Sequence, residues 1–403
     1  MYKGNYMRFL TANNVYPISA APVANGVLVL DDNHRVLNLF TPGDEEYPSA
    51  HARAEHFDGI LTPGFVNAHC HLELSYLKGK IAKHTGLHGF VRDMMTIRKY
   101  TADEEVLAAI ESAEAEMLRN GIVAVGDISN DDFTFAQKAQ RNMLYYTFIE
   151  LFGLNADKAE AIFDGGEALL QKLEELIPRA PANITPHATY SLSNKLLKLI
   201  AEHNYLRDGV ISIHNQETEG ENEFFKTGTG PIADQMFRFG LDSDSYKPTG
   251  FNSLASTVVH LPNCNRILLV HNTVSTKSDV QWATDYGKLM YWVLCPNANL
   301  YIENKLPNVP MLRQMGAKIL VGTDSYASND SLSILDELKT IAANFPETPT
   351  AELLQWATLN GAEALGFKQQ LGSFDKGKIP GVNFVTVDER GEIYPSSSVT
   401  KLA

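Results

Sequence analysis

The chain has 403 residues, a hydrophobic fraction of 44% and a formal net charge of −14. These values predict a folded protein with a sizeable core, either one large domain with an appendage or two to three ordinary domains. The acidic balance argues against sequence-independent nucleic-acid binding, which takes most of its affinity from a basic surface. No run of about 18 apolar residues occurs, so we expect no membrane partner.

The cysteines and the first residues bear on the cellular compartment. Cys70, Cys264 and Cys295 match neither a disulfide framework nor a zinc ribbon in their spacing. Residues 1–6 lack the apolar segment of a signal peptide. We therefore expect a cytoplasmic protein that acts on a small molecule and forms either a monomer or a homodimer.

Both chain ends are rich in short β segments. Strands are predicted at 6–15, 26–30 and 35–40, with a hairpin turn at Asp31-Asp32-Asn33. A turn followed by a strand recurs at 377–388. We predict that residues 1–58 and 368–403 form one small β-sandwich-like domain.

Residues 59–367 alternate strand-like and helical patterns. The expected helices are 87–100, 103–120 (closed by Gly121), 133–141, 158–176, 194–204, 277–286 and 307–316. Eight strands that alternate with helices predict a parallel sheet, because parallel neighbours need crossover connections. The predicted fold is an α/β (β/α)8 barrel of the TIM type. The long interval 216–252 is either a lid over the site or an inert insertion.

Two histidines one residue apart, His69 and His71, follow an apolar strand-like run. Alternation along a strand points both rings to one side, which is a typical metal-binding arrangement. Further strand-like runs end at His187, His214 and His271, and the last one ends at Asp324. The C-terminal ends of strands are where TIM barrels carry their catalytic groups.

His69, His71, His214 and Asp324 offer three nitrogen ligands and one oxygen ligand, which suits one divalent metal ion that also holds water. Zn²⁺ is favoured and Fe²⁺ is the alternative. Such an ion makes hydroxide available near neutral pH. Glu217 lies three residues beyond His214, so it is a candidate proton shuttle.

Several roles stay open at this point. His271 is either a further ligand or a hydrogen-bond partner of the hydroxide, and Asp324 either binds metal only or also takes a proton. His187 either contacts substrate or orients a neighbour. Glu150 would bridge a second ion in a binuclear site, but no strand-end lysine lies near it for carbamylation, so we favour one metal and a structural Glu150. Cys70 is expected to be a packed thiol and Cys295 not to be a nucleophile, since no base lies beside it.

The motifs resemble those of the amidohydrolase superfamily, in particular the branch with cytosine, guanine and S-adenosylhomocysteine deaminases and chlorotriazine hydrolases. The matching segments are 63–71 (PGFVNAHCH), 186–188 (PHA), 214–217 (HNQE), 270–272 (VHN), 295–300 (CPNANL), 322–325 (GTDS) and 327–330 (ASND). The resemblance implies His69, His71, His214 and Asp324 as ligands, Glu217 as the shuttle and His271 beside the attacking water. The chain departs from the branch at Asn215-Gln216 and at Val382-Asn383.

A narrower similarity, to aminodeoxyfutalosine deaminases, rests on 71–75 (HLELS), 89–92 (GFVR) and Arg98. If strand alternation continued past His71, Glu73 would face the metal side and accept hydrogen bonds from substrate hydroxyls. Arg92 or Arg98 would clamp an acidic appendage, or would be solvated surface residues.

The function predicted from these patterns is hydrolytic deamination of an amino-substituted heterocycle, such as an adenine nucleoside derivative of the aminodeoxyfutalosine kind. The alternatives are an amide or C–Cl hydrolase with the same metal site, and a catalytically silent barrel that acts as a binding protein.

Overall fold

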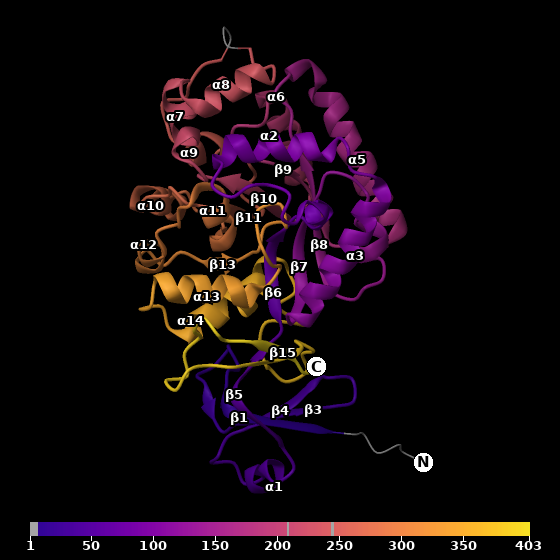
Figure 1. Cartoon of the computed structure of the whole chain (residues 1–403), viewed down its shortest axis with the longest axis vertical. Coiled ribbons are helices and arrows are strands. Elements are labelled where there is room, and N and C mark those ends of the chain that lie inside the picture. Colours follow the sequence, from indigo (N-terminus) through magenta and orange to yellow (C-terminus); the bar gives the residue numbers. More distant parts are fainter. Residues whose placement is uncertain (1–6, 208, 243–245) are drawn as a thin grey trace. The chain divides into compact units, whose positions relative to one another are not determined.

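The computed structural model describes residues 7–207, 209–242 and 246–403. The chain divides into two compact units (Figure 1), Met1–Ala68 with Ala115–Val125 and Ser333–Ala403, and His69–Glu114 with Gly126–Leu332. Within the described ranges, no helix combines the length and hydrophobicity that a membrane span requires.

The first unit contains a seven-stranded sheet built from both ends of the chain, in the order β15-β14-β5-β1-β3-β4, with β2 paired to β1. Its strands are β1 (Arg8–Val15), β2 (Val23–Ala24), β3 (Val27–Leu30), β4 (Val36–Phe40), β5 (Glu55–Pro63), β14 (Val382–Val385) and β15 (Val399–Lys401). The predicted hairpin is confirmed, because β3 and β4 pair in antiparallel fashion. β14 pairs with β5, which joins the two chain ends. The sandwich-like domain with boundaries at 58 and 368 stays a prediction.

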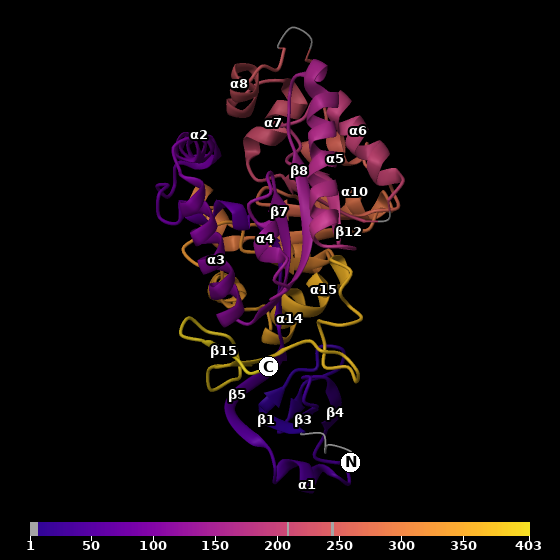
Figure 2. The ribbon, with the colours of Figure 1, turned by 90° about the vertical axis from the view of Figure 1, so that its right-hand side faces the viewer.

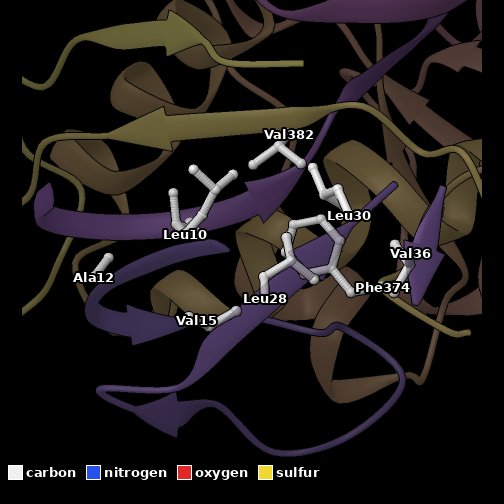
Figure 3. Packing of buried hydrophobic residues seen from close by; sticks show 9 residues of the cluster. Leu10, Ala12, Val15, Leu28, Leu30, Val36, Phe374 and Val382 are labelled. Carbon is white, nitrogen blue, oxygen red and sulfur yellow. The ribbon is translucent and has the colours of Figure 1, made fainter. Parts of the chain in front are cut away.

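One core of this unit lies against the sheet (Figure 3). Alternate residues of β1 and β3, among them Leu10 and Leu28, pack with Val382 of β14 and with Phe374. The period of two residues places them on one face of the sheet. Burying each large apolar side chain contributes about 1.5–3 kcal/mol.

A buried polar contact follows the helix α3 (Asp103–Arg119). Gly121 has the left-handed φ of +73° that the predicted helix end requires. The Asn383 side-chain amide donates to the Gly121 carbonyl at 2.9 Å. A side chain at 121 would overlap Asn383. The pair therefore needs glycine for both backbone and space.

The strands that carry the predicted site residues form two four-stranded sheets, with orders β6-β7-β8-β9 and β10-β11-β12-β13. They are β6 (Phe65–Cys70), β7 (Ile122–Ser129), β8 (Leu144–Leu151), β9 (Ala182–Pro186), β10 (Val210–Asn215), β11 (Arg266–His271), β12 (Met290–Leu294) and β13 (Ile319–Val321). Pairing is parallel between β8 and β9 and throughout β10 to β13. The apolar run that leads to His69 is split at Gly64, since 59–63 belong to β5.

Helices connect these strands. In chain order the remaining helices are α1 (Tyr47–His51), η1 (Leu72–Leu77), α2 (Gly86–Arg98), α4 (Phe135–Lys138), η2 (Ala156–Lys158), α5 (Ala159–Leu176), α6 (Asn194–Tyr205), α7 (Glu219–Thr227), α8 (Pro231–Arg238), α9 (Ser253–Val258), α10 (Lys277–Asp285), α11 (Pro296–Glu303), α12 (Val309–Gln314), α13 (Ile334–Asn344), α14 (Thr350–Gln355), η3 (Trp356–Asn360) and α15 (Gly361–Ala364).

The predicted helices are observed within a few residues, except that α4 is shorter than the expected 133–141. α5 and α6 lie beside β8 and β9 (Figure 2), and their apolar faces share a core with residues such as Ile149 and Ile184. The interval 216–252, expected to be either a lid or an inert insertion, contains α7 and α8, and the choice between the two stays a prediction. Residues 243–245 of that interval lie outside the described ranges.

Two isolated parallel bridges lie at the ends of these sheets. Ala188 pairs with His214, and Cys70 pairs with Asp324. The His214 amide donates to the His187 carbonyl at 2.9 Å, and the Asp324 amide donates to the His69 carbonyl at 3.1 Å. The end of β9 is thereby joined to β10, and the end of β6 to the segment after β13.

Candidate metal centre and active site

Three imidazoles converge at the ends of β6 and β10. His69 lies in β6, His71 follows its last residue, and His214 is the penultimate residue of β10. The Nε2 atom of His71 lies 3.1 Å from Nε2 of His69 and 3.3 Å from Nε2 of His214. All three side chains are buried.

The three nitrogens have the spacing that a bound metal ion needs. Tetrahedral coordination with Zn–N bonds of about 2.0–2.1 Å separates two ligand nitrogens by about 3.3–3.4 Å. Burial first, and the neighbouring histidines second, lower the pKa of His69 and of His71 well below the usual value. Burial lowers the pKa of His214 to about 4. Neutral rings with facing lone pairs repel one another unless a cation lies between them, so these residues fit a metal ion.

The orientation of His214 is fixed by its other nitrogen. Nδ1 of His214 donates to the His187 carbonyl at 2.6 Å, which leaves Nε2 as an unprotonated ligand atom. A carboxylate oxygen of Glu150 lies 3.6 Å from the same Nδ1. Glu150 is held in turn by the side chain of Asn130, which donates to its other oxygen at 3.1 Å.

Asp324 supplies the oxygen of the predicted ligand set. Its Oδ1 atom lies 3.8 Å from Nε2 of His69 and 3.6 Å from Nε2 of His71. The Ser328 hydroxyl donates to Oδ2 at 2.5 Å, so the carboxylate is turned with Oδ1 toward the histidines. Burial raises the pKa of Asp324 to about 7, against the opposing effect of the Ser328 hydrogen bond.

Unusual backbone conformations gather at these strand ends. Gln216, His271, Asn272 and Asp324 have φ values of +46°, +76°, +59° and +56°. Side-chain-bearing residues in this region are strained by about 1–3 kcal/mol each, and such strain collects at functional sites.

Glu217 and His271, the two candidate acid–base residues, lie close to each other. A carboxylate oxygen of Glu217 lies 3.8 Å from Nε2 of His271, and both side chains are buried. Burial raises the pKa of Glu217 well above its usual value, and the nearby Glu221 adds to the effect. The amide of Asn299 donates to Nδ1 of His271 at 3.3 Å and to the Thr273 hydroxyl at 2.8 Å. His271 therefore presents a protonated Nε2 toward Glu217, which favours a hydrogen-bonding role over a role as a further ligand.

A second group of potential ligands consists of Glu150, His187 and His214. Its His214 atom already donates to a carbonyl, and the Ser191 hydroxyl lies 3.0 Å from Nδ1 of His187. These contacts favour an orienting role for Glu150. The ring of His187 lies 4.8 Å from that of His214 and 5.9 Å from that of Phe152, between centroids.

Glu73 is placed differently from the strand argument. The strand ends at Cys70 and residues 72–77 form the 3-10 helix η1, so alternation does not continue to Glu73. The side chain is nevertheless only 2% exposed. Its Oε2 accepts from the Asn130 amide at 2.8 Å, while Oε1 is buried without a hydrogen-bond partner in the described part of the chain.

The two arginines differ. Arg98 donates to Asp131 at 2.8 Å. Burial raises the pKa of Glu73 and the charge of Arg98 opposes this rise, whereas burial lowers the pKa of His71 and the charge of Arg98 adds to this fall, so Arg98 lies near both residues. Arg92 pairs with the adjacent Asp93 at 2.8 Å, and its side chain is 67% exposed. The contacts of Arg92 do not bring it to the histidines.

Three residues that the sequence argument did not single out hold the candidate catalytic groups in place. Ser328 and Asn299 lie inside motifs that carried the resemblance, so their contacts were within reach of the pattern. Glu221 lies three residues beyond Thr218, and a threonine followed at this spacing by a glutamate is typical of the start of a helix. This spacing was the feature of the sequence that could have pointed to Glu221.

The three converging histidines could thus hold a divalent metal ion. The amidohydrolase family model matches residues 60–402. The chain belongs to the amidohydrolase family.

Named relatives and solved structures agree with this assignment. An aminodeoxyfutalosine deaminase from Deinococcus radiodurans is 24% identical over 373 residues, which cover 89% of this chain and 86% of that protein. The crystal structure of Helicobacter pylori aminofutalosine deaminase in complex with methylthio-coformycin has a TM-score of 0.79 at 22% identity and covers 95% of this chain and 93% of its own. An adenosine deaminase from Xanthomonas campestris with bound zinc has a TM-score of 0.71 at 22% identity, over 95% of this chain and 85% of its own.

Proposed function

We propose that this protein is a metal-dependent hydrolytic deaminase that releases ammonia from an adenine nucleoside derivative, with aminodeoxyfutalosine as the favoured substrate. The observation that carries the proposal is the convergence of three histidine nitrogens beside the buried Glu217 and His271, with Nε2 of His71 lying 3.1 Å from Nε2 of His69 and 3.3 Å from Nε2 of His214. The named relatives support the substrate class, because they are deaminases of aminodeoxyfutalosine and adenosine.

The proposed cofactor is one Zn²⁺ ion, with Fe²⁺ as the alternative, held by His69, His71, His214 and Asp324. The ion would supply Lewis acidity and make hydroxide available near neutral pH. The zinc in the Xanthomonas campestris structure supports this choice. A single ion is favoured because the second ligand group shares His214, whose Nδ1 is engaged with a carbonyl.

The residues around the ion divide the proton transfers. Burial keeps a proton on Glu217, so this carboxyl donates it to the ring nitrogen next to the amine-bearing carbon. Asp324 takes the proton of the attacking water, and Nε2–H of His271 holds the oxygen by a hydrogen bond. The water oxygen forms a bond to carbon, and Asp324 passes the proton it took to the amine nitrogen. The C–N bond then breaks and ammonia leaves, while the second proton of the water returns to Glu217 as the carbonyl forms.

We further propose that the two four-stranded sheets close into one (β/α)8 barrel. The support comes from the bridges Ala188–His214 and Cys70–Asp324, which link the outer strands of one sheet to those of the other. In a closed barrel all site residues lie at the carboxyl ends of strands, where such folds carry their active sites.

Glu73 and Arg98 are proposed to recognise the rest of the substrate. The unpartnered Oε1 of Glu73 suits a sugar hydroxyl, and Arg98 suits an acidic appendage. Arg92, exposed and paired with Asp93, is left out of this proposal. His187 is proposed to contact the substrate ring beside Phe152.

The test measures ammonia release from aminodeoxyfutalosine, adenosine and guanine by the zinc-loaded protein. Turnover of the first well above the other two supports the proposal. Equal turnover of the two nucleosides would discard the acidic-appendage argument, and turnover of guanine alone would discard the nucleoside. Chloride release from a chlorotriazine without any ammonia release would favour the C–Cl hydrolase.

A further inference from the structure

The segment that carries Glu217 is held by a second buried carboxylate. Glu221 accepts hydrogen bonds from three consecutive backbone amides, those of Gln216 at 2.9 Å, Glu217 at 2.7 Å and Thr218 at 3.1 Å. The Thr189 hydroxyl donates to the same carboxylate at 3.2 Å. The side chain of Glu221 is buried, with 1% of the residue exposed.

These contacts exceed what the start of a helix requires. α7 begins at Glu219, so an acidic side chain at its third position ordinarily accepts from the amide of the preceding N-cap residue, here Thr218. The Gln216 and Glu217 amides lie upstream of the helix. Both oxygens of Glu221 are used, and half of their donors come from those two amides.

The turn needs such support because of its backbone. Gln216 has a φ of +46°, a strained value for a side-chain-bearing residue. This φ redirects the chain between the end of β10 and α7, and thereby sets where the next residue, Glu217, points. A carboxylate that accepts from the amides on both sides of Glu217 stabilises this one conformation.

Contacts with the segment that follows β11 fix the same turn at residues 215 and 216. Gln216 accepts from the Ser275 hydroxyl at 2.6 Å, and its carbonyl accepts from the Val274 amide at 3.0 Å. The Asn215 amide donates to Asn272 at 3.0 Å. Asn215 and Gln216 thus supply additional polar contacts around Glu217.

We propose that Glu221 is a positioning residue that fixes the backbone of the 216–218 turn and so aims the carboxyl of Glu217 at the substrate. The inference rests on the proposed function of Glu217 as proton donor, and it adds a residue outside the ligand and acid–base set. Thr189 extends the clamp to the segment after β9.

The decisive variant is Glu221→Gln, which keeps the shape but offers one acceptor oxygen and places an NH₂ group against backbone donors. We expect kcat to fall by about 10²-fold, the scale for misplacing a catalytic group by an ångström, with metal content and KM retained. The matched control is Glu219→Gln on the same helix, whose carboxylate is 74% exposed and pairs with Lys305 at 3.1 Å. The control should keep the parent's kcat.

Backbone hydrogen exchange tests the clamp without any activity. In Glu221→Gln the amides of 216–218 should exchange faster than in the parent, while those of α10 should not change. Thr189→Val, which leaves the carboxylate intact, should accelerate the same amides to a smaller extent. Unchanged exchange at 216–218 in Glu221→Gln, or a parental kcat, would overturn the inference.

The two arms also separate this inference from the proposed function. A parent protein that releases no ammonia from any compound would remove the proposed function, and the exchange arm would still decide whether Glu221 holds the turn. Faster exchange with loss of bound metal would assign Glu221 to the stability of the metal site, and the aiming role would be wrong.

Discussion

Replacing Glu217 by Gln removes the group that the proposed mechanism uses to protonate the substrate ring. The substitution preserves side-chain volume at a position that is only 4% exposed, so it should leave little cavity or strain. It also breaks no strong native contact, because the nearest His271 nitrogen lies 3.8 Å away, beyond hydrogen-bonding distance. The change therefore isolates the proton itself.

The expected loss follows from that role. A positioned proton donor contributes about 10²–10⁴-fold to the rate, which corresponds to roughly 2.7–5.4 kcal/mol in the activation barrier. Stability should move the other way. Because burial raises the pKa of Glu217, its charged form is disfavoured in the folded state near neutral pH, and the uncharged amide removes this cost. We expect a melting temperature equal to or above that of the parent.

The assay combines steady-state ammonia release, elemental analysis and thermal unfolding of Glu217→Gln and of the control Glu219→Gln. The reasoning predicts a lower kcat, one retained metal ion and an undiminished melting temperature for the first variant, and parental values for the second. Unaltered turnover in Glu217→Gln would refute the proton-donor role. Loss of the metal would show that Glu217 is a ligand or supports one.

Three further predictions concern the metal, the fold and pH. Elemental analysis should find one divalent ion per chain, and His69→Ala should lose it; two ions in the parent would show a binuclear centre. In urea unfolding, Gly121→Ala should lower the unfolding free energy by about 1–2 kcal/mol because an alanine is strained at the left-handed φ, and by about 1–3 kcal/mol more because its Cβ disturbs the hydrogen bond from Asn383. The control Gly391→Ala, at a φ of +80° with open space around it, should show only the first of these losses. Equal losses would mean that Asn383 yields freely. Burial lowers the pKa of Lys288 to about 8 from the usual 10.5. Between these two pH values the unfolded chain binds one more proton at Lys288 than the folded chain does, so this group makes the free energy of unfolding rise with pH. The melting temperature of Lys288→Met should therefore rise less with pH than that of the parent, and an identical slope would contradict the assignment.

The candidate ligands could be predicted from the sequence because each is a local signal. His69 and His71 are one residue apart in a strand, and His214 and Asp324 end apolar runs, so strand periodicity alone aligns them. The same holds for the long helices, whose apolar period is visible in sequence, and for Gly121 at a helix end. The proton-shuttle role of Glu217 was predicted from its spacing to His214 along the chain, and it stays a prediction.

The contacts that orient the site residues, and the exposure of their neighbours, were decided only by the tertiary structure. Nothing in the strand pattern shows that Ser328 turns the Asp324 carboxylate, that the His187 carbonyl fixes the His214 ring, or that Glu73 enters a 3-10 helix and is still buried. The exposed pairing of Arg92 with Asp93 likewise depends on how α2 is placed. Hydrogen bonds and burial depend on the spacing of atoms in three dimensions, whereas sequence periodicity reports only which side of a helix or strand a residue occupies. The sequence therefore determined which chemical groups the site contains, and the fold determined how their side chains are oriented.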